Sequence, residues 1–127
     1  MRSNEVSGST LAYLGDAIWS LKVREYLIEK GYARAKDLQT KSVKFVSAKA
    51  QAAFYYKLEE EKFFTEQELE IFKRGRNFKS DSVPKNTDVA TYRVSTGFEA
   101  VLGYWFMEKK IDRIDLCWDK VKTMVEV

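Results

Sequence analysis

The sequence contains no histidine at all, and this absence removes several kinds of chemistry. Ser-His-Asp and Cys-His nucleophilic catalysis, histidine acid–base catalysis and histidine-rich zinc or iron sites all lack their central group. If the chain is an enzyme, then carboxylates, hydroxyls, lysines and bound hard cations must perform the reaction. Oxygen ligands of this kind suit magnesium, manganese or calcium.

Cysteine and long apolar runs are also scarce. Cys117 is the only cysteine, which excludes an intramolecular disulfide and a cysteine-rich metal site. No uncharged apolar run approaches the roughly 18 to 20 residues of a membrane span, and no basic-plus-apolar leader is recognisable. We therefore expect a cytoplasmic protein with no membrane partner.

The pattern of apolar residues is helical nearly throughout, and the single proline, Pro84, lies outside every periodic segment. Thr65 and Glu68 have the spacing of a capping box, and Asp88 is placed to cap a later helix. Because no repeat or linker divides the chain, we expect one all-α domain over residues 1–127. The expected helices span 11–30, 35–40, 43–59, 66–74, 88–109 and from 112 toward the C-terminus, with an irregular stretch at 75–87.

Two carboxylates stand alone in apolar helical runs, Asp16 within residues 11–19 and Glu99 within residues 98–106. An ionised carboxylate removed from water is costly unless it pairs with a cation or binds a metal. If the two helices pack antiparallel, both acids can hold one hard cation. The alternative is that each acid pairs with an arginine or caps a helix. At about 100° per residue, Asp16 lies nearly opposite the stripe expected to face the core, which consists of Leu11, Leu14, Ile18 and Leu21.

The net charge of +3 is unevenly distributed along the chain. Residues 73–85 carry a net charge of +4, which leaves −1 for the rest. A concentrated basic segment in a nearly neutral domain indicates an anionic partner, with nucleic acid ahead of a membrane. A solvated charged loop is the alternative. The candidate contacts are Arg74, Arg76, Lys79 and Lys85.

Several segments resemble the ribonuclease III family. Residues 11–17 resemble its signature motif, residues 98–103 resemble its second acidic motif, and residues 46–49 look like a further element between them. More narrowly, three later segments resemble the Mini-ribonuclease III branch of bacteria and plastids. These segments are 74–80, 84–88 and 91–93.

The resemblance implies a ribonuclease III endonuclease-domain helical bundle that forms a homodimer and cleaves double-stranded RNA with Mg²⁺, for which Mn²⁺ is a substitute. In this branch the substrate is precursor 23S ribosomal RNA of the large subunit, and a ribosomal protein is a candidate partner. The branch lacks a separate double-stranded-RNA-binding domain, and we expect none here. The resemblance assigns Asp16 and Glu99 as catalytic metal ligands, and it assigns RNA binding to Arg74, Arg76, Asn77, Lys79 and Lys85.

This chain departs from the family pattern at two positions. Ala12 and Thr96 stand where the wider family has acids, so only Asp16 and Glu99 carry over. The number of metal ions per site is therefore open, and Ser95 and Thr96 are candidates to order a metal-bound water. Two other hypotheses for the function remain. One is a catalytically inactive RNA-binding module on the same scaffold, and the other is a helical interaction protein with an acidic partner.

A symmetric dimer is also expected on physical grounds. The runs 11–19 and 98–106 are apolar nearly all round, and such helices must bury both sides. A chain of 127 residues offers little bulk to cover two of them. A second copy would complete the burial and pair two sites, each cutting one strand.

Overall fold

The computed structural model describes residues 1–78 and 87–127, and every regular element in these ranges is helical. This confirms the expected all-α fold for the described part of the chain. None of the helices in these ranges has the length and hydropathy needed to cross a membrane. The elements are η1 (Ser3–Glu5), α1 (Gly8–Glu29), α2 (Ala35–Val46), α3 (Ala48–Glu60), α4 (Glu66–Arg76), α5 (Val89–Met107), α6 (Ile111–Val121) and η2 (Lys122–Met124).

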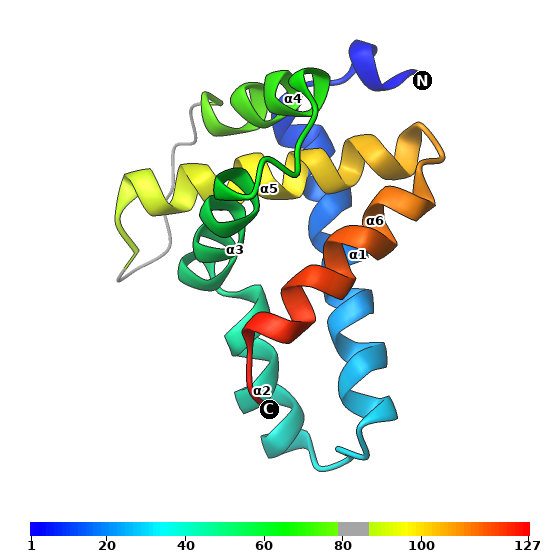
Figure 1. The fold of residues 1–127 in the computed structure, drawn as a ribbon, viewed down its shortest axis with the longest axis vertical. Helices are drawn as coiled ribbons and strands as arrows, with labels where there is room; N and C mark the ends of the chain where they lie inside the picture. The colour runs from blue at the N-terminus through cyan, green and yellow to red at the C-terminus, as the bar shows by residue number, and fades with distance from the viewer. Residues whose placement is uncertain (79–86) are drawn as a thin grey trace.

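Helix α5 is the centre of the molecule. It packs against α1, α3, α4 and α6 (Figure 1). Six consecutive residues, Ala100 to Trp105, are buried, so every side of this segment is covered. The chain itself therefore buries the helix that is apolar nearly all round, and α5 gives no separate reason for a dimer.

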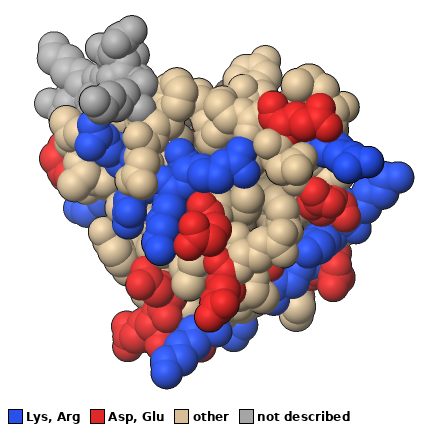
Figure 2. Space-filling view, turned by 90° about the horizontal axis from the view of Figure 1, so that it is seen from above, with Lys and Arg blue, Asp and Glu red and all other residues tan. Residues whose placement is uncertain are grey.

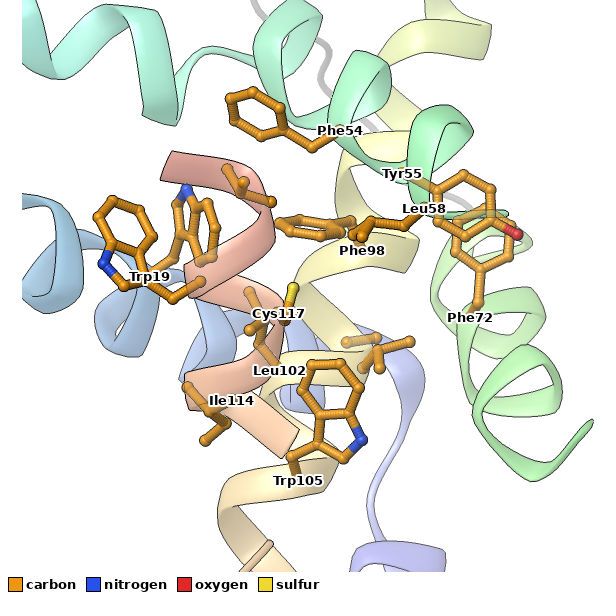
Figure 3. Close-up of a cluster of buried hydrophobic side chains, with 14 of the residues drawn as sticks. Trp19, Phe54, Tyr55, Leu58, Phe72, Phe98, Leu102, Trp105, Ile114 and Cys117 are labelled. Carbon is orange, nitrogen blue, oxygen red and sulfur yellow. The ribbon is translucent and has the colours of Figure 1, made fainter. Parts of the chain in front are cut away.

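Aromatic side chains join the helices around α5 (Figure 3). The indole of Trp19 on α1 is fully buried and meets Phe98 of α5 edge to face, with ring centroids 5.1 Å apart. It also meets Trp118 of α6 at 5.2 Å. Its Nε1 donates to the carbonyl oxygen of Phe45 at 2.8 Å, which satisfies the buried indole.

The packing face of α1 differs from the predicted one. Leu11 is buried as expected, but Leu21 is 61% exposed, and Leu14 and Ile18 are only partly buried. The leucine spacing was misleading because Trp19, Gly8 and Gly15 pack closely against neighbouring helices. These contacts, rather than the leucines, decide which face of α1 is buried. The buried face consists of Gly8, Leu11, Ala12, Gly15, Trp19, Val23 and Leu27. Asp16 therefore borders the buried face of α1, whereas the prediction had placed it opposite.

The boundary between α2 and α3 also differs from the prediction. A single helix was expected over 43–59, but α2 continues to Val46 and the break falls at Ser47. Ser47 has an extended backbone, and its Oγ accepts a hydrogen bond from the Ala50 N–H at 3.1 Å. A serine N-cap of this kind favours a new helix start over a continuous helix.

The two predicted N-caps, at the starts of α4 and α5, are confirmed. The capping box of Thr65 and Glu68 is present at the start of α4, and the side chain of Asp88 caps α5 through the Thr91 N–H. Gly75 does not end α4 as predicted, because the helix continues to Arg76. Gly75 instead allows close packing, since a Cβ there would lie 2.7 Å from the Cβ of Ala100.

Candidate active site

Two glycines allow α1 and α5 to cross at backbone contact. A Cβ on Gly15 would lie 1.8 Å from the carbonyl oxygen of Glu99, and one on Gly103 would lie 2.0 Å from that of Leu11. The helices cross rather than run antiparallel (Figure 1), which corrects the predicted arrangement. Because Asp16 directly follows Gly15, this crossing brings the two acids together.

Asp16 and Glu99 line the same open cavity, which has a volume of about 390 Å³. Asp16 is exposed and Glu99 is half-buried. Ser95 and Thr96 lie in the same cavity. The remaining lining residues are Ser9, Ala12, Tyr13, Val46, Ala48 and Tyr92.

The carboxyl group of Glu99 lies in an environment that disfavours its charge. Burial, together with the hydrogen bond and negative charge of Asp16, raises the pKa of Glu99 from its ordinary 4.5 to about 9, against a hydrogen bond from Gln51 that lowers it. Within residues 1–78 and 87–127, neither acid forms an ion pair and no lysine or arginine lines the cavity. The described residues therefore do not support the alternative of structural ion pairs.

Gln51 is a site residue that the sequence analysis missed. Its side chain is 1% exposed. Its Nε2 donates to Glu99 Oε2 at 3.3 Å, and its Oε1 accepts from Ser95 Oγ at 2.7 Å. The sequence did contain a signal for this residue. Gln51 is a polar residue on the same helical stripe as Tyr55 and Leu58, both of which are buried.

The two predicted water-ordering residues both line the cavity. The hydroxyl of Ser95 donates to Gln51, and that of Thr96 donates to the backbone oxygen of Tyr92 at 3.0 Å. A hydroxyl that donates once keeps lone pairs as acceptors. Both oxygens can thus accept a hydrogen bond from a water in the cavity.

The donor set fits a hard divalent cation. Two carboxylates and two hydroxyls provide only oxygen atoms, which are the ligands that Mg²⁺ prefers. The described residues contain no group of three or more acidic, cysteine or histidine side chains arranged for a metal. Two protein carboxylates suffice for Mg²⁺, because this ion usually keeps several of its waters.

The predicted RNA-binding residues occupy the end of α4 and the segment after it. Arg74 donates through Nη2 to the backbone oxygen of Val6, which ties the N-terminal segment to α4. Arg76 lies 5.5 Å from the ring centre of Phe72, and its Nε donates to Asn77 Oδ1 at 3.1 Å. Lys79 and Lys85 lie outside the described residues.

The surface around α4 is mixed in charge. Figure 2, the view from above, shows lysines and arginines interspersed with acidic side chains on this face. The concentration of basic residues along the sequence therefore does not make this face uniformly positive.

Comparisons with known proteins agree with this arrangement. Residues 9–110 match the model of the ribonuclease III domain. The chain is 47% identical to a Mini-ribonuclease 3 of Streptococcus pneumoniae over 112 residues, or 88% of each chain. It is 45% identical to one of Staphylococcus aureus over 116 residues, which cover 91% of this chain and 87% of the relative.

A solved structure shows the same fold. The crystal structure of a protein from Fusobacterium nucleatum superimposes with a TM-score of 0.82 at 33% identity, and 92% of each chain is covered. The family match spans both acidic motifs and the crossing of α1 and α5. The chain therefore belongs to the ribonuclease III family, in its Mini-ribonuclease 3 branch.

Proposed function

We propose that the protein is a Mg²⁺-dependent endoribonuclease that cleaves double-stranded RNA, with Asp16 and Glu99 as its metal ligands and catalytic acids. The observation that carries the proposal is the meeting of these two carboxylates in one open cavity with no cation beside them among the described residues. Membership of the ribonuclease III family supports nuclease activity. Mn²⁺, a similar hard cation, would substitute for Mg²⁺.

In this proposal the carboxylates and the hydroxyls of the site have different roles in catalysis. A bound divalent cation lowers the pKa of a water and offsets charge on the attacked phosphate. Asp16, which is exposed, and Glu99, which is half-buried, supply negative charge at the mouth and wall of the cavity. Ser95 and Thr96 offer acceptor oxygens that order a water there. No step requires a histidine, which the chain lacks.

The basic segment supplies the RNA contacts in this proposal. Duplex RNA is recognised mainly through phosphates and 2′-hydroxyls across its minor groove. Arg76 and Asn77, which lie at the end of α4, are two of the proposed contacts, and Arg74, Lys79 and Lys85 complete the set. Binding should weaken steeply with salt, with roughly one counterion released per phosphate neutralised. By the resemblance, the cellular substrate is precursor 23S ribosomal RNA in the cytoplasm, with a ribosomal protein as a candidate partner.

An apolar stripe on α1 supports the proposed homodimer. Tyr13, Leu21 and Ile28 are 83%, 61% and 62% exposed, and they fall within about 80° on the helix. Tyr13 also lines the candidate active site. A second copy packed on this stripe would cover it and place two cavities near each other. Sedimentation of the wild type and of Leu21→Glu tests this, since the variant should shift the protein toward monomer.

Cleavage of a defined duplex RNA with and without Mg²⁺ tests the function. Asp16→Asn and Glu99→Gln should each lose at least about a hundredfold in rate, because a metal supplies several kcal/mol of transition-state stabilisation. Glu25→Gln, at an exposed position of α1, is the matched control and should cleave normally. Absence of cleavage by the wild type, or full activity in either site variant, would contradict the proposal.

The same variants distinguish the two competing interpretations. A catalytically inactive RNA-binding module would bind duplex RNA in a salt-sensitive way, without cleavage and without response to Mg²⁺ or to Asp16→Asn. A helical interaction protein with an acidic partner would not bind duplex RNA at physiological salt.

A further inference from the structure

Gln51 joins α3 to two positions on α5 that are one helical turn apart. It accepts from Ser95 and donates to Glu99, and it is almost completely buried. No buried side-chain polar atom in the described part of the chain lacks a partner, so this network is complete. Burial of an amide is costly unless its polar atoms form hydrogen bonds, and the bonds to Ser95 and Glu99 offset that cost for Gln51.

We propose that Gln51 is a positioning residue that holds the Glu99 carboxylate in the orientation that binds the divalent cation. This inference rests on the proposed function. Gln51 Nε2 contacts one carboxylate oxygen, Oε2, and Glu99 lines the cavity together with Asp16. A residue that orients a ligand in this way commonly changes metal affinity when it is replaced.

The chemistry of an amide suits this role better than that of other side chains. A lysine or arginine at position 51 would neutralise Glu99 and compete with the cation. An apolar residue would leave the three side-chain torsions of Glu99 free, and fixing them would then oppose metal binding. A neutral N–H donor fixes the carboxylate and leaves its charge available.

Ser95 sets the direction of the amide. Its hydroxyl donates to Gln51 Oε1 at 2.7 Å, so the opposite edge of the amide, Nε2, faces Glu99. The Ser47 cap begins α3 at Ala48, which places Gln51 in the first turn beside the cavity. The break between α2 and α3 that sequence reasoning misplaced is therefore part of the site.

Gln51→Met tests the role, because methionine keeps the shape and removes both hydrogen bonds. Binding of Mn²⁺ to RNA-free protein, followed by electron paramagnetic resonance, should weaken about tenfold or more. The KM for duplex RNA should stay within about twofold while kcat at limiting Mg²⁺ falls, since the RNA contacts lie elsewhere. Gln67→Met, at an exposed position of α4, is the matched control and should match the wild type.

Ser95→Ala provides a second route if Gln51→Met does not fold. Its Mn²⁺ affinity should fall by less, about two- to fivefold, because Gln51 keeps its contact with Glu99. In the double variant the two effects should be less than additive, because the hydrogen bond from Ser95 acts on Glu99 through Gln51. Additive effects would overturn this part of the proposal.

The outcomes separate this inference from the proposed function. If Gln51→Met lowers the unfolding midpoint but binds Mn²⁺ within twofold of the wild type, Gln51 is merely structural and the inference is wrong. If the wild type binds no Mn²⁺, or Asp16→Asn and Glu99→Gln bind it as the wild type does, then the proposed function fails and the inference fails with it.

Discussion

Two glutamates, Glu68 on α4 and Glu99 on α5, have opposite electrostatic environments. Glu68 is 3% exposed and accepts hydrogen bonds from Arg113 at 2.6 and 3.0 Å, from the Trp105 indole at 2.8 Å and from the Thr65 N–H at 3.0 Å. Burial alone would raise the pKa of Glu68, but these donors outweigh it and lower the pKa below its usual value.

Glu99 has none of these cationic partners among the described residues. Burial and the neighbouring carboxylate of Asp16 raise its pKa to about 9, against one hydrogen bond from the neutral amide of Gln51 that lowers it. The fold evidently can supply a cation to a buried acid, since it does so for Glu68. An acid kept without one is typical of a functional site. The difference supports the proposal that Glu99 binds an external cation.

Removal of the cation beside Glu68 should have the largest effect on stability. Arg113→Met leaves a buried carboxylate uncompensated, which costs about 3–5 kcal/mol. Urea unfolding should show this loss, whereas the affinity of the folded variant for Mn²⁺ should match the wild type. A stability change below about 1 kcal/mol would mean that Glu68 is not held as the structure indicates.

The stability of the metal-free protein should fall as the pH rises from 6 to 8. Glu99 binds its proton up to about pH 9 in the folded chain but only to about 4.5 when unfolded, so folding takes up one proton in this window. The free energy of unfolding should therefore decrease by about 1.4 kcal/mol per pH unit. No histidine titration overlaps this pH range, because the chain has no histidine.

Urea titrations in EDTA measure this slope. Glu99→Gln cannot ionise at this position and should show almost no pH dependence between 6 and 8. Saturating Mg²⁺ should flatten the slope in the wild type, because the cation binds the ionised form and neither the metal-bound folded state nor the unfolded chain then holds this proton. Equal slopes for the wild type and Glu99→Gln would show that Glu99 does not titrate abnormally.

Gly15→Ala should separate the two helices that form the site. The added Cβ would lie 1.8 Å from the Glu99 carbonyl oxygen, so the backbones must move apart. We expect a stability loss of about 1–3 kcal/mol and a large loss of cleavage, measured by urea unfolding and by duplex RNA cleavage. Glu25→Ala, exposed on the same helix, should stay within about 0.5 kcal/mol. Normal activity in Gly15→Ala would show that the close crossing is unnecessary.

Loss of a surface ion pair should have the smallest effect on the free energy of unfolding, in contrast to loss of the buried pair at Glu68. Lys22 Nζ lies 2.6 Å from Asp115 Oδ1, but the two side chains are 29% and 52% exposed. Lys22→Met should change the free energy of unfolding by less than about 1 kcal/mol. A much larger loss would indicate that exposure is a poor guide to the strength of ion pairs in this molecule.

The two acids were predictable because their signal is local. A single charge in an apolar run is visible in sequence, and so are the glycines at Gly15 and Gly103. The caps at Thr65 and Asp88 were predicted correctly for the same reason, since each depends on residues within one turn.

The misplaced features depend on contacts between distant segments. The core face of α1 is decided by Trp19 and Gly15 against α5, which the spacing of leucines does not reveal. The role of Gln51 depends on α5 side chains 44 and 48 positions away. Periodicity predicts which residues share a face but not which face a neighbouring helix covers.

The central claim is that Glu99 is held without a cation so that a divalent ion can bind it. Carbon-13 NMR of the glutamate side-chain carboxyls, with Glu99 assigned by the Glu99→Gln spectrum, measures its titration directly. We predict a metal-free titration near pH 9 that saturating Mg²⁺ moves below about 7, because only the ionised carboxylate binds the metal. A Glu99 resonance that titrates near 4.5 and does not respond to Mg²⁺ would contradict the account.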